Sequence, residues 1–333
     1  MQTGVVTLRE AGQLLAVMPV MIARSRRGPA LSVRFDFHPG DAKFVREKSK
    51  WRFLPVNQLS PPLSIESGNL RGGYLADPTA NGPLIWRHLA AALGDIPGWT
   101  VAVFPVPMEK GEERLAPFHD GPLTGFVRSS DRRFYSCERV APWDQLVQKM
   151  SHNARKSVNR AVRRAEEAGL RCVVFDRSDN LNEGFRNLAA IAQVSWKEAG
   201  RDKSPVHLPY TERQRSFYEG LGSATTRLRA AVFCLVQPDQ CRAAALTFAN
   251  GNCLTACIIC YAPEIASAYP GRLLVKAIVD WAVTNGIERL DFNATDSWVE
   301  PFSDLVEEYG QLVAFNRGLY GRLLNAAARR LAT

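Results

Sequence analysis

The chain has 333 residues, of which 46% are hydrophobic and 23% are charged, and its formal net charge is +9. This composition is typical of a globular protein long enough for two domains, and it excludes a disordered or collagen-like chain. The positive charge favours polyanionic partners such as a phosphorylated cofactor, a nucleic acid or an anionic membrane surface.

The cysteines and the N-terminal segment bear on the cellular compartment. The seven cysteines lack the spacing of a disulfide framework, which predicts a reducing, cytoplasmic setting. The most apolar N-terminal run, residues 11–23, contains Gln13 and Pro19 and is shorter than the roughly 20 residues that span a bilayer. We interpret it as a buried segment of the first domain, and the alternative is a cleaved signal peptide.

Residues 1–140 give weak signals and are predicted to form a small α/β domain. Residues 1–30 mix helix-like and strand-like patterns. The expected elements are a strand at 31–37, a surface loop at 58–73, a helix at 83–93, a strand at 99–106, and loop with one strand at 121–137.

The pattern sharpens at Pro142, where the second domain (141–333) begins. Apolar residues at helical spacing predict one helix over residues 142–169, ended by Gly169. From Lys149 to Arg171 there are seven Lys/Arg against two acids. A solvated face is the commonest explanation of such a run, but like charges repel along a helix. We therefore favour an anion-binding surface, with Arg155, Lys156 and Arg160 as candidate substrate-binding residues.

The next elements alternate between strand and helix signals. Thr211 opens a capping-box pattern, and Asn250-Gly251 is a favoured hairpin turn. The predicted elements are a strand at 170–175, helices at 182–199 and 211–220, and three antiparallel strands at 227–236, 241–249 and 252–261.

The central unit follows as strand, loop, helix and strand. The uncharged strand 252–261 leads to a helix that opens at Gly271 and ends at Gly286, and a strand at 287–295 places Asp291 on its polar face. A unit of this length is a right-handed crossover between parallel strands. The start of its helix leaves backbone N–H groups unpaired, which suits an anion such as a phosphate.

The last segment is predicted as a loop at 296–303, a loop or strand at 307–315 and a basic helix at 316–331. The sheet of the second domain is therefore expected to be mixed, antiparallel on one side and with a parallel crossover at its end.

This order resembles the GNAT superfamily of acyltransferases and, within it, the Fem-like acetyltransferase branch. The resemblance covers residues 143–310 and is carried by 151–169, by Ser195-Trp196-Lys197, by 259–263 and by 269–274 with Asp291-Phe292. It implies an α/β (α+β-like) GNAT fold with a mixed, mostly antiparallel central sheet. It also implies a tandem arrangement whose degenerate N-terminal GNAT-like half is residues 1–140.

Two features depart from the family pattern. GNAT enzymes have several glycines in the loop that holds the cofactor pyrophosphate, whereas the corresponding loop here has only Gly271. The Fem-like branch often has a tyrosine–lysine pair shortly after the last core strand, whereas residues 298–310 contain no lysine. These departures leave the identity of the acyl donor open.

The resemblance implies direct attack of an amine on the thioester of acetyl-CoA or another acyl-CoA. Such a site needs an anion-binding group, an N–H donor for the oxyanion and a base. Asp291 is the candidate base, because partial desolvation would raise its pKa. The resemblance implies that Cys260 and Tyr261 at the end of the strand bind the cofactor. It implies that the cofactor diphosphate is bound by Tyr269, Gly271, Arg272 and Leu273. It also implies Tyr261 and Tyr309 as acids that protonate the leaving thiolate, and Trp196 as a wall of the acceptor site.

Each of these residues also has a structural interpretation. Gly271 could be a turn glycine, Asp291 an ordinary polar strand residue, and Trp196 or the tyrosines core residues. Strict alternation puts Cys253 and Cys257 on one face of their strand and Cys260 on the other, so they are interpreted as core residues rather than metal ligands.

The leading hypothesis is an acyl-CoA-dependent acyltransferase acting on an amine or hydroxyl of a small molecule or cell-envelope saccharide. One alternative is a transferase that takes its acyl group from aminoacyl-tRNA, as Fem-type relatives do, and another is a non-catalytic anion-binding module. The expected setting is cytoplasmic, with peripheral contact at the inner face of the membrane, no metal and no DNA partner.

Overall fold

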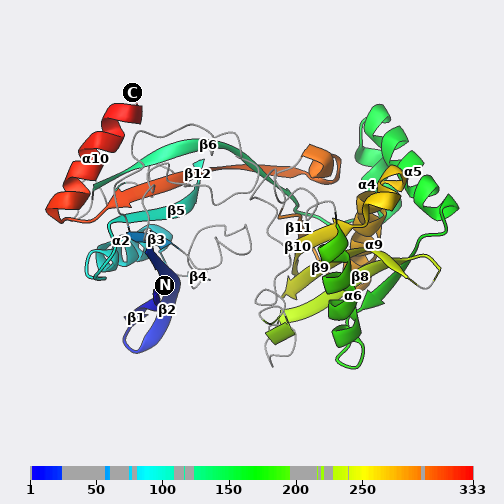
Figure 1. Ribbon diagram of the computed structural model, residues 1–333, viewed down its shortest axis with the longest axis horizontal. Coiled ribbons are helices and arrows are strands. Elements are labelled where there is room, and N and C mark those ends of the chain that lie inside the picture. Colours follow the sequence, from blue (N-terminus) through cyan, green and yellow to red (C-terminus); the bar gives the residue numbers. More distant parts are fainter. Residues whose placement is uncertain are drawn as a thin grey trace. The chain divides into compact units, whose positions relative to one another are not determined.

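The structure is a computed structural model, and it describes residues 2–24, 57–60, 75–76, 81–108, 116, 124–195, 216, 219–220, 228–238, 240–293 and 297–332. The chain forms two compact units, one of Met1–Arg132 with Glu307–Thr333 and one of Arg133–Val306. Figure 1 labels the elements of each unit. The described residues contain no helix of the length and hydropathy that a bilayer crossing requires.

A mixed sheet forms the centre of the second unit, with the strand order β6-β11-β10-β9-β8-β7. Neighbours run antiparallel except β10 and β11, which are parallel. The mixed, mostly antiparallel sheet expected from the sequence is thus confirmed. The strands are β6 (Thr124–Cys137), β7 (Arg171–Phe175), β8 (Leu228–Val236), β9 (Cys241–Asn250), β10 (Cys253–Tyr261) and β11 (Arg289–Asp291).

Helices cover both faces of this sheet (Figure 1). On one face, α6 (Leu181–Val194) buries its apolar side chains with Val232 and Cys234 of β8 in one core. On the other face, the alternate residues Phe233 and Leu235 join a second core with α4 (Trp143–Lys149), α5 (His152–Glu167) and α9 (Pro270–Thr284). We call these the α6 core and the α9 core.

The segment predicted as one helix over 142–169 forms two helices, α4 and α5, so that prediction is wrong. The chain leaves the helix at Met150, whose ψ is 154°, and starts again after Ser151. The Ser151 side chain accepts a hydrogen bond from the N–H of Ala154 at 3.3 Å. Serine is a favoured N-cap residue because its oxygen satisfies an otherwise unpaired N–H. The apolar stripe continues across the break, which is why the spacing alone did not indicate it.

In the first unit, the strands are ordered β1-β2-β3-β5-β12. Residues that gave mixed signals at the N-terminus form the hairpin β1–β2, and the predicted helix and strand at 83–93 and 99–106 are present as α2 and β5. The elements are β1 (Gln2–Glu10), β2 (Gln13–Arg24), β3 (Asn57–Ser60), β4 (Leu75–Ala76), α2 (Gly82–Leu93), β5 (Val101–Pro107), β12 (Leu305–Phe315) and α10 (Leu319–Ala332).

The C-terminal segment returns to the first unit. β12 pairs antiparallel with β5, from Tyr309 opposite Pro107 to Phe315 opposite Val101, and α10 follows it within the same unit. The sequence instead assigned the helix at 316–331 to the domain 141–333. Sequence spacing holds no signal for such a return, because the strand pairing joins residues about 200 positions apart.

Several predicted elements lie outside the described residues. These are the strand at 31–37, residues 61–73 of the loop at 58–73, the end of the helix at 182–199 with Trp196, and most of the helix at 211–220. The described start of that predicted loop, residues 58–60, is part of strand β3, so the prediction is wrong there.

Gly184 lets α6 pack closely on the sheet. A Cβ at this position would lie 2.7 Å from the Cβ of Phe175 and 2.9 Å from the Cβ of Val232. Overpacking of this kind typically costs about 1–3 kcal/mol, which exceeds the roughly 1 kcal/mol that alanine gains over glycine in a helix. We therefore expect Gly184→Ala to lower the free energy of unfolding, measured by urea denaturation. A matched Gly220→Ala change, where a Cβ meets nothing within 4 Å, should not lower it.

Candidate active site

The candidate site lies where β10 and β11 part. The two strands pair from Cys253 with Arg289 to Thr255 with Asp291. β11 ends there, whereas β10 continues to Tyr261, with β9 as its only partner among the described strands. The edge of β10 beyond Thr255 can therefore offer backbone hydrogen-bonding groups to a ligand. The sequence predicted this parting near Tyr261, and it begins earlier.

Asp291 ends β11 at the start of this opening. The residue is only 9% exposed, and its Oδ1 accepts a hydrogen bond from the N–H of Asn293 at 2.8 Å. Asn293 has a positive φ of 50°, so this bond forms the tight turn that ends the strand. The charge of Asp291 also contributes to the raised pKa of Cys257. The carboxylate therefore lies near the part of β10 that has left β11.

Cys257 is the extra residue of a bulge in β10. The pairing with β9 passes from Ala256 opposite Thr247 to Ile258 opposite Leu246, which leaves Cys257 without an opposite residue. Strict alternation put Cys257 and Cys260 on opposite faces of the strand. That prediction is wrong, because a bulge shifts the alternation by one residue and both cysteines pack against the α6 core.

The pKa of Cys257 depends on its burial and on the charge of Asp291. Burial, and then the charge of Asp291, raise this pKa to about 12. Because the thiolate is the nucleophile, we expect iodoacetamide to leave Cys257 unmodified near neutral pH. In Asp291→Asn one cause of the raised pKa is lost, so alkylation at a fixed alkaline pH should become faster, as measured by peptide mass spectrometry. Equal rates in the two proteins would contradict the proximity of these side chains.

The helix α9 follows β10 after one short 3₁₀ helix. The 3₁₀ helix η3 (Pro263–Ala268) leads to Tyr269, whose backbone is left-handed with φ 52° and ψ 51°. Pro270 has no N–H, and the N–H of Arg272 bonds to the Tyr269 carbonyl at 3.0 Å. Among the described residues, the N–H of Gly271 has no hydrogen-bond acceptor. A helix start with an unpaired N–H favours a negatively charged group.

Arg272 holds a positive charge at this helix start. Its Nη1 donates a hydrogen bond to Ser157 Oγ of α5 at 2.7 Å, and its guanidinium carbon lies 5.6 Å from the ring centroid of Tyr269. These two contacts fix the guanidinium between α9 and α5. The charge and the unpaired N–H of Gly271 together form a candidate anion site.

Trp298 packs against the same helix start. It lies in the 3₁₀ helix η4 (Ser297–Phe302), and its ring carbons are 3.6 and 3.7 Å from where a Cβ of Gly271 would stand. A methyl group at Gly271 would make ordinary contact, whereas a longer side chain would have to displace the indole ring. The sequence analysis gave Trp298 no role, because the rest of α9, β11 and a loop separate it from Gly271 along the chain.

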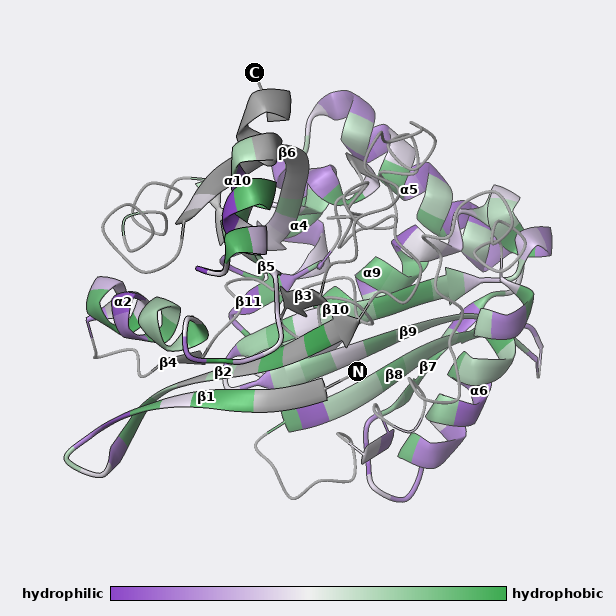
Figure 2. Ribbon diagram, turned by 60° about the vertical axis from the view of Figure 1, so that its left-hand side comes forward, coloured by the Kyte–Doolittle hydropathy of each residue, from purple (hydrophilic) through white to green (hydrophobic). Residues whose placement is uncertain are grey.

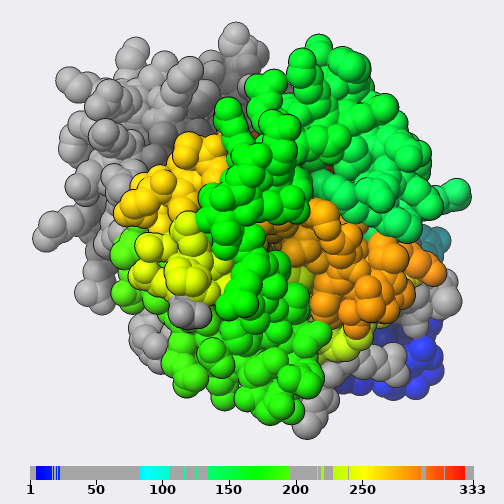
Figure 3. All heavy atoms as spheres, turned by 90° about the vertical axis from the view of Figure 1, so that its right-hand side faces the viewer, coloured from blue at the N-terminus to red at the C-terminus, as the bar shows by residue number. Residues whose placement is uncertain are grey.

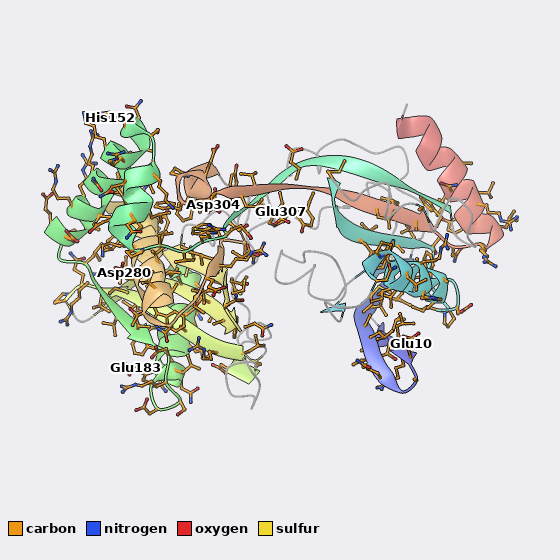
Figure 4. The ribbon with its side chains drawn as sticks, turned by 180° about the vertical axis from the view of Figure 1, so that it is seen from behind. Glu10, His152, Glu183, Asp280, Asp304 and Glu307 are labelled. Carbon is orange, nitrogen blue, oxygen red and sulfur yellow. The ribbon has the colours of Figure 1, made fainter. Side chains whose placement is uncertain are left out.

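The exposed face of α5 carries one arginine that is hydrogen-bonded within the protein and two cations that have no partner among the described residues. Arg155 is engaged, because its Nη2 donates to the carbonyls of Gln148 at 2.8 Å and Met150 at 3.2 Å at the end of α4. Lys156 and Arg160 are exposed and have no ion pair or hydrogen bond within the described part of the chain. Figure 4 shows nitrogen-tipped side chains projecting from α5 around the labelled His152, and Figure 3 shows this face of the unit in space-filling form.

The remaining candidates are dispersed. Tyr261 is half-buried at the end of β10, and burial raises its pKa. Cys260 and Leu273 are buried, so only their backbone groups are available at the site. Tyr309 is buried in β12 of the first unit. Trp196 lies outside the described residues. The roles of all five stay predictions.

Comparison with known protein families gives a match over one segment of the chain. Residues 152–302 match the family described as the acetyltransferase (GNAT) domain. Among proteins of curated function, none matches the sequence.

Solved structures are similar at low sequence identity. A crystal structure of FemX has a TM-score of 0.59 at 11% identity, with 98% of this chain and 90% of that chain covered. The C-terminal domain of a putative lysylphosphatidylglycerol synthetase from Agrobacterium fabrum has a TM-score of 0.52 at 12% identity, with 98% of this chain and 88% of that chain covered. Residues 152–302 therefore match the acetyltransferase (GNAT) domain, and the chain has a GNAT-type, Fem-like fold.

Proposed function

We propose that the protein transfers an acyl group, acetyl in the simplest case, from acyl-CoA to an amine or hydroxyl of a small molecule or cell-envelope saccharide. The observation that supports this most is the parting of β10 from β11 beside the start of α9. A strand edge of this kind can pair with the amide-bearing arm of CoA. The adjacent helix start suits the CoA diphosphate.

The residues at the helix start would bind the donor. The backbone N–H groups of Gly271 and Leu273 would face the diphosphate, and the guanidinium of Arg272 would add charge. Tyr269 would lie beside them with Arg272 against its ring. Trp298 would form the wall opposite Gly271.

The reaction would proceed by direct attack. The amine nitrogen forms a bond to the thioester carbon, and a backbone N–H near Cys260 or Tyr261 stabilises the oxyanion. The carbon–sulfur bond then breaks. Asp291 accepts the proton that the attacking nitrogen loses, and Tyr261 supplies a proton to the departing thiolate. Solvent exchange restores both groups.

Thermal denaturation with acetyl-CoA tests the donor. A ligand at a hundred times its Kd stabilises the folded protein by about 2.7 kcal/mol, so acetyl-CoA should raise the Tm by a few degrees. Release of free thiol in the presence of candidate amines then measures transfer. A Tm unchanged by acetyl-CoA would contradict the proposal.

A second candidate donor is aminoacyl-tRNA, which the unpaired cations of α5 favour. Lys156 and Arg160 lie one helical turn apart, so both can reach phosphates of one backbone. We expect Lys156→Gln/Arg160→Gln to weaken tRNA binding and to lower its salt dependence by the equivalent of about two phosphate contacts. The matched control is Arg177→Gln/Arg186→Gln, two exposed arginines outside α5.

Thermal denaturation with each ligand and the transfer assay distinguish the two candidate donors. Stabilisation by tRNA and not by acetyl-CoA would favour the second candidate. If both ligands bind and neither supports transfer, the module binds anions without catalysis.

A further inference from the structure

The C-terminal helix α10 exposes an apolar face. Leu319 is 78% exposed and Leu323 is 60% exposed, and their spacing of four residues puts them on one side of the helix. Gly321 and Leu324 are buried on the opposite side. Figure 2 shows hydrophobic residues in green along the described part of α10.

Two hydrogen bonds of Asn316 anchor the segment just before this helix. Asn316, just before α10, donates a side-chain hydrogen bond to the carbonyl of Trp99 and a backbone hydrogen bond to the carbonyl of Thr100 at 3.1 Å. A Cβ at Gly321 would clash with the Asn316 carbonyl oxygen, so the helix packs closely on its own N-terminal connection. The buried Gly321 and Leu324 and the exposed Leu319 and Leu323 define the inner and outer sides of α10.

The segment that contains α10 carries only positive charges on its side chains. Residues 310–333 contain Arg317, Arg322, Arg329 and Arg330 and no acidic residue. Arg322 is exposed next to Leu323. A helix with exposed leucines and only positive charge is the pattern of segments that lie on anionic membrane surfaces.

Other occupants fit this face less well. A second copy in a two-fold arrangement would set the same patch against itself and bring the arginines of both copies together. A nucleic acid would pair with the arginines but would leave the leucines in water. A bilayer with anionic lipids accommodates both, because the leucines enter the acyl boundary and the arginines meet the headgroups.

We propose that α10 docks the protein on the surface of an anionic lipid bilayer. Leu319 and Leu323 insert at the boundary between headgroups and acyl chains, and Arg322 contacts anionic headgroups. A contact of this size gives weak, reversible binding that depends on salt. The proposal does not depend on which acyl donor the protein uses.

Vesicle flotation of the full chain tests the proposal. We expect the protein to float with vesicles of equal parts phosphatidylglycerol and phosphatidylcholine at low salt, and not with phosphatidylcholine alone. Leu319→Glu/Leu323→Glu should lower the partition coefficient at least about tenfold, since it removes both apolar contacts and adds two negative charges. Arg322→Gln should lower it less, through headgroup attraction alone.

The matched control replaces two exposed apolar residues elsewhere, Leu84 of α2 and Val283 of α9, with glutamate. Their exposures are 50% and 37%, and the charge change is the same. The control should float as the wild type does, and far-UV circular dichroism should be unchanged in every variant.

Three results would overturn the proposal. The first is equal flotation with both kinds of vesicle, and the second is an equal loss in the control. The third is a change in sedimentation velocity on Leu319→Glu/Leu323→Glu without vesicles, because it would identify a second copy as the occupant of this face.

Discussion

Gly271→Glu is expected to abolish the stabilisation of the protein by acetyl-CoA. The new carboxylate would stand at the start of α9, where the proposed diphosphate binds, and like charges at that point repel. Its chain would also meet the Trp298 ring, which already lies 3.6 Å from a Cβ at this position. The wild type should gain about 2.7 kcal/mol at a hundred times Kd, and the variant close to none, as measured by thermal denaturation.

Gly271→Ala is the matched control. Its Cβ would make ordinary van der Waals contact with the Trp298 ring, and alanine favours a helix over glycine. We expect this variant to keep most of the response to acetyl-CoA. A full response in Gly271→Glu would place the diphosphate elsewhere. A response lost in both variants would mean that steric space, and not charge, decides binding.

Asp291→Asn is expected to lower kcat by about 10²–10⁴-fold, the range for loss of a general base. Donor stabilisation should persist, because the asparagine Oδ1 can still accept the hydrogen bond from the N–H of Asn293 and so keep the turn. Steady-state release of free thiol measures the rate. The pH profile of kcat should lose the limb that reports ionisation of the base.

The control for this change is Asp280→Asn on the exposed side of α9. Asp280 forms an ion pair with Lys276 at 2.6 Å, and exposed pairs of this kind contribute about 0–1 kcal/mol. Its kcat should equal that of the wild type. If Asp291→Asn also turns over at the wild-type rate across the pH range, Asp291 is not the base.

Much of the fold could be predicted because its signals are local. Gly169 and Gly286 have positive φ of 72° and 67°, and both end helices where the sequence places them, since glycine adopts this conformation without strain. The meander of β8, β9 and β10 follows the predicted strands. Each of these signals involves residues within one turn or one hairpin.

The predictions that were wrong depend on contacts between distant residues or on single residues within a helix or strand. The break between α4 and α5 is made by Ser151 within an unbroken apolar stripe, and the bulge at Cys257 is a matter of register with β9 that spacing does not encode. The return of β12 to β5 depends on partners far apart in the sequence. Periodicity identifies elements, but it does not identify which strand lies beside which.

The sequence could group part of the candidate site for the same reason, and the roles of its residues stay predictions. Gly271 and Asp291 belong to one strand–helix–strand unit, so their neighbourhood follows from that unit. The contacts of Trp298 with Gly271 and of Ser157 with Arg272 join elements that the unit does not contain. Their geometry emerges only when α5 and η4 are packed on α9.

The return of the chain at β12 has a consequence for biosynthesis. Arg133–Val306 is a continuous stretch, so a nascent polypeptide possesses every strand of that unit as soon as residue 306 leaves the ribosome. The other unit must wait for β12 and α10, although its hairpin β1–β2 precedes the continuous unit in the sequence. The order of maturation on the ribosome should thus run opposite to the usual N-terminal-first rule.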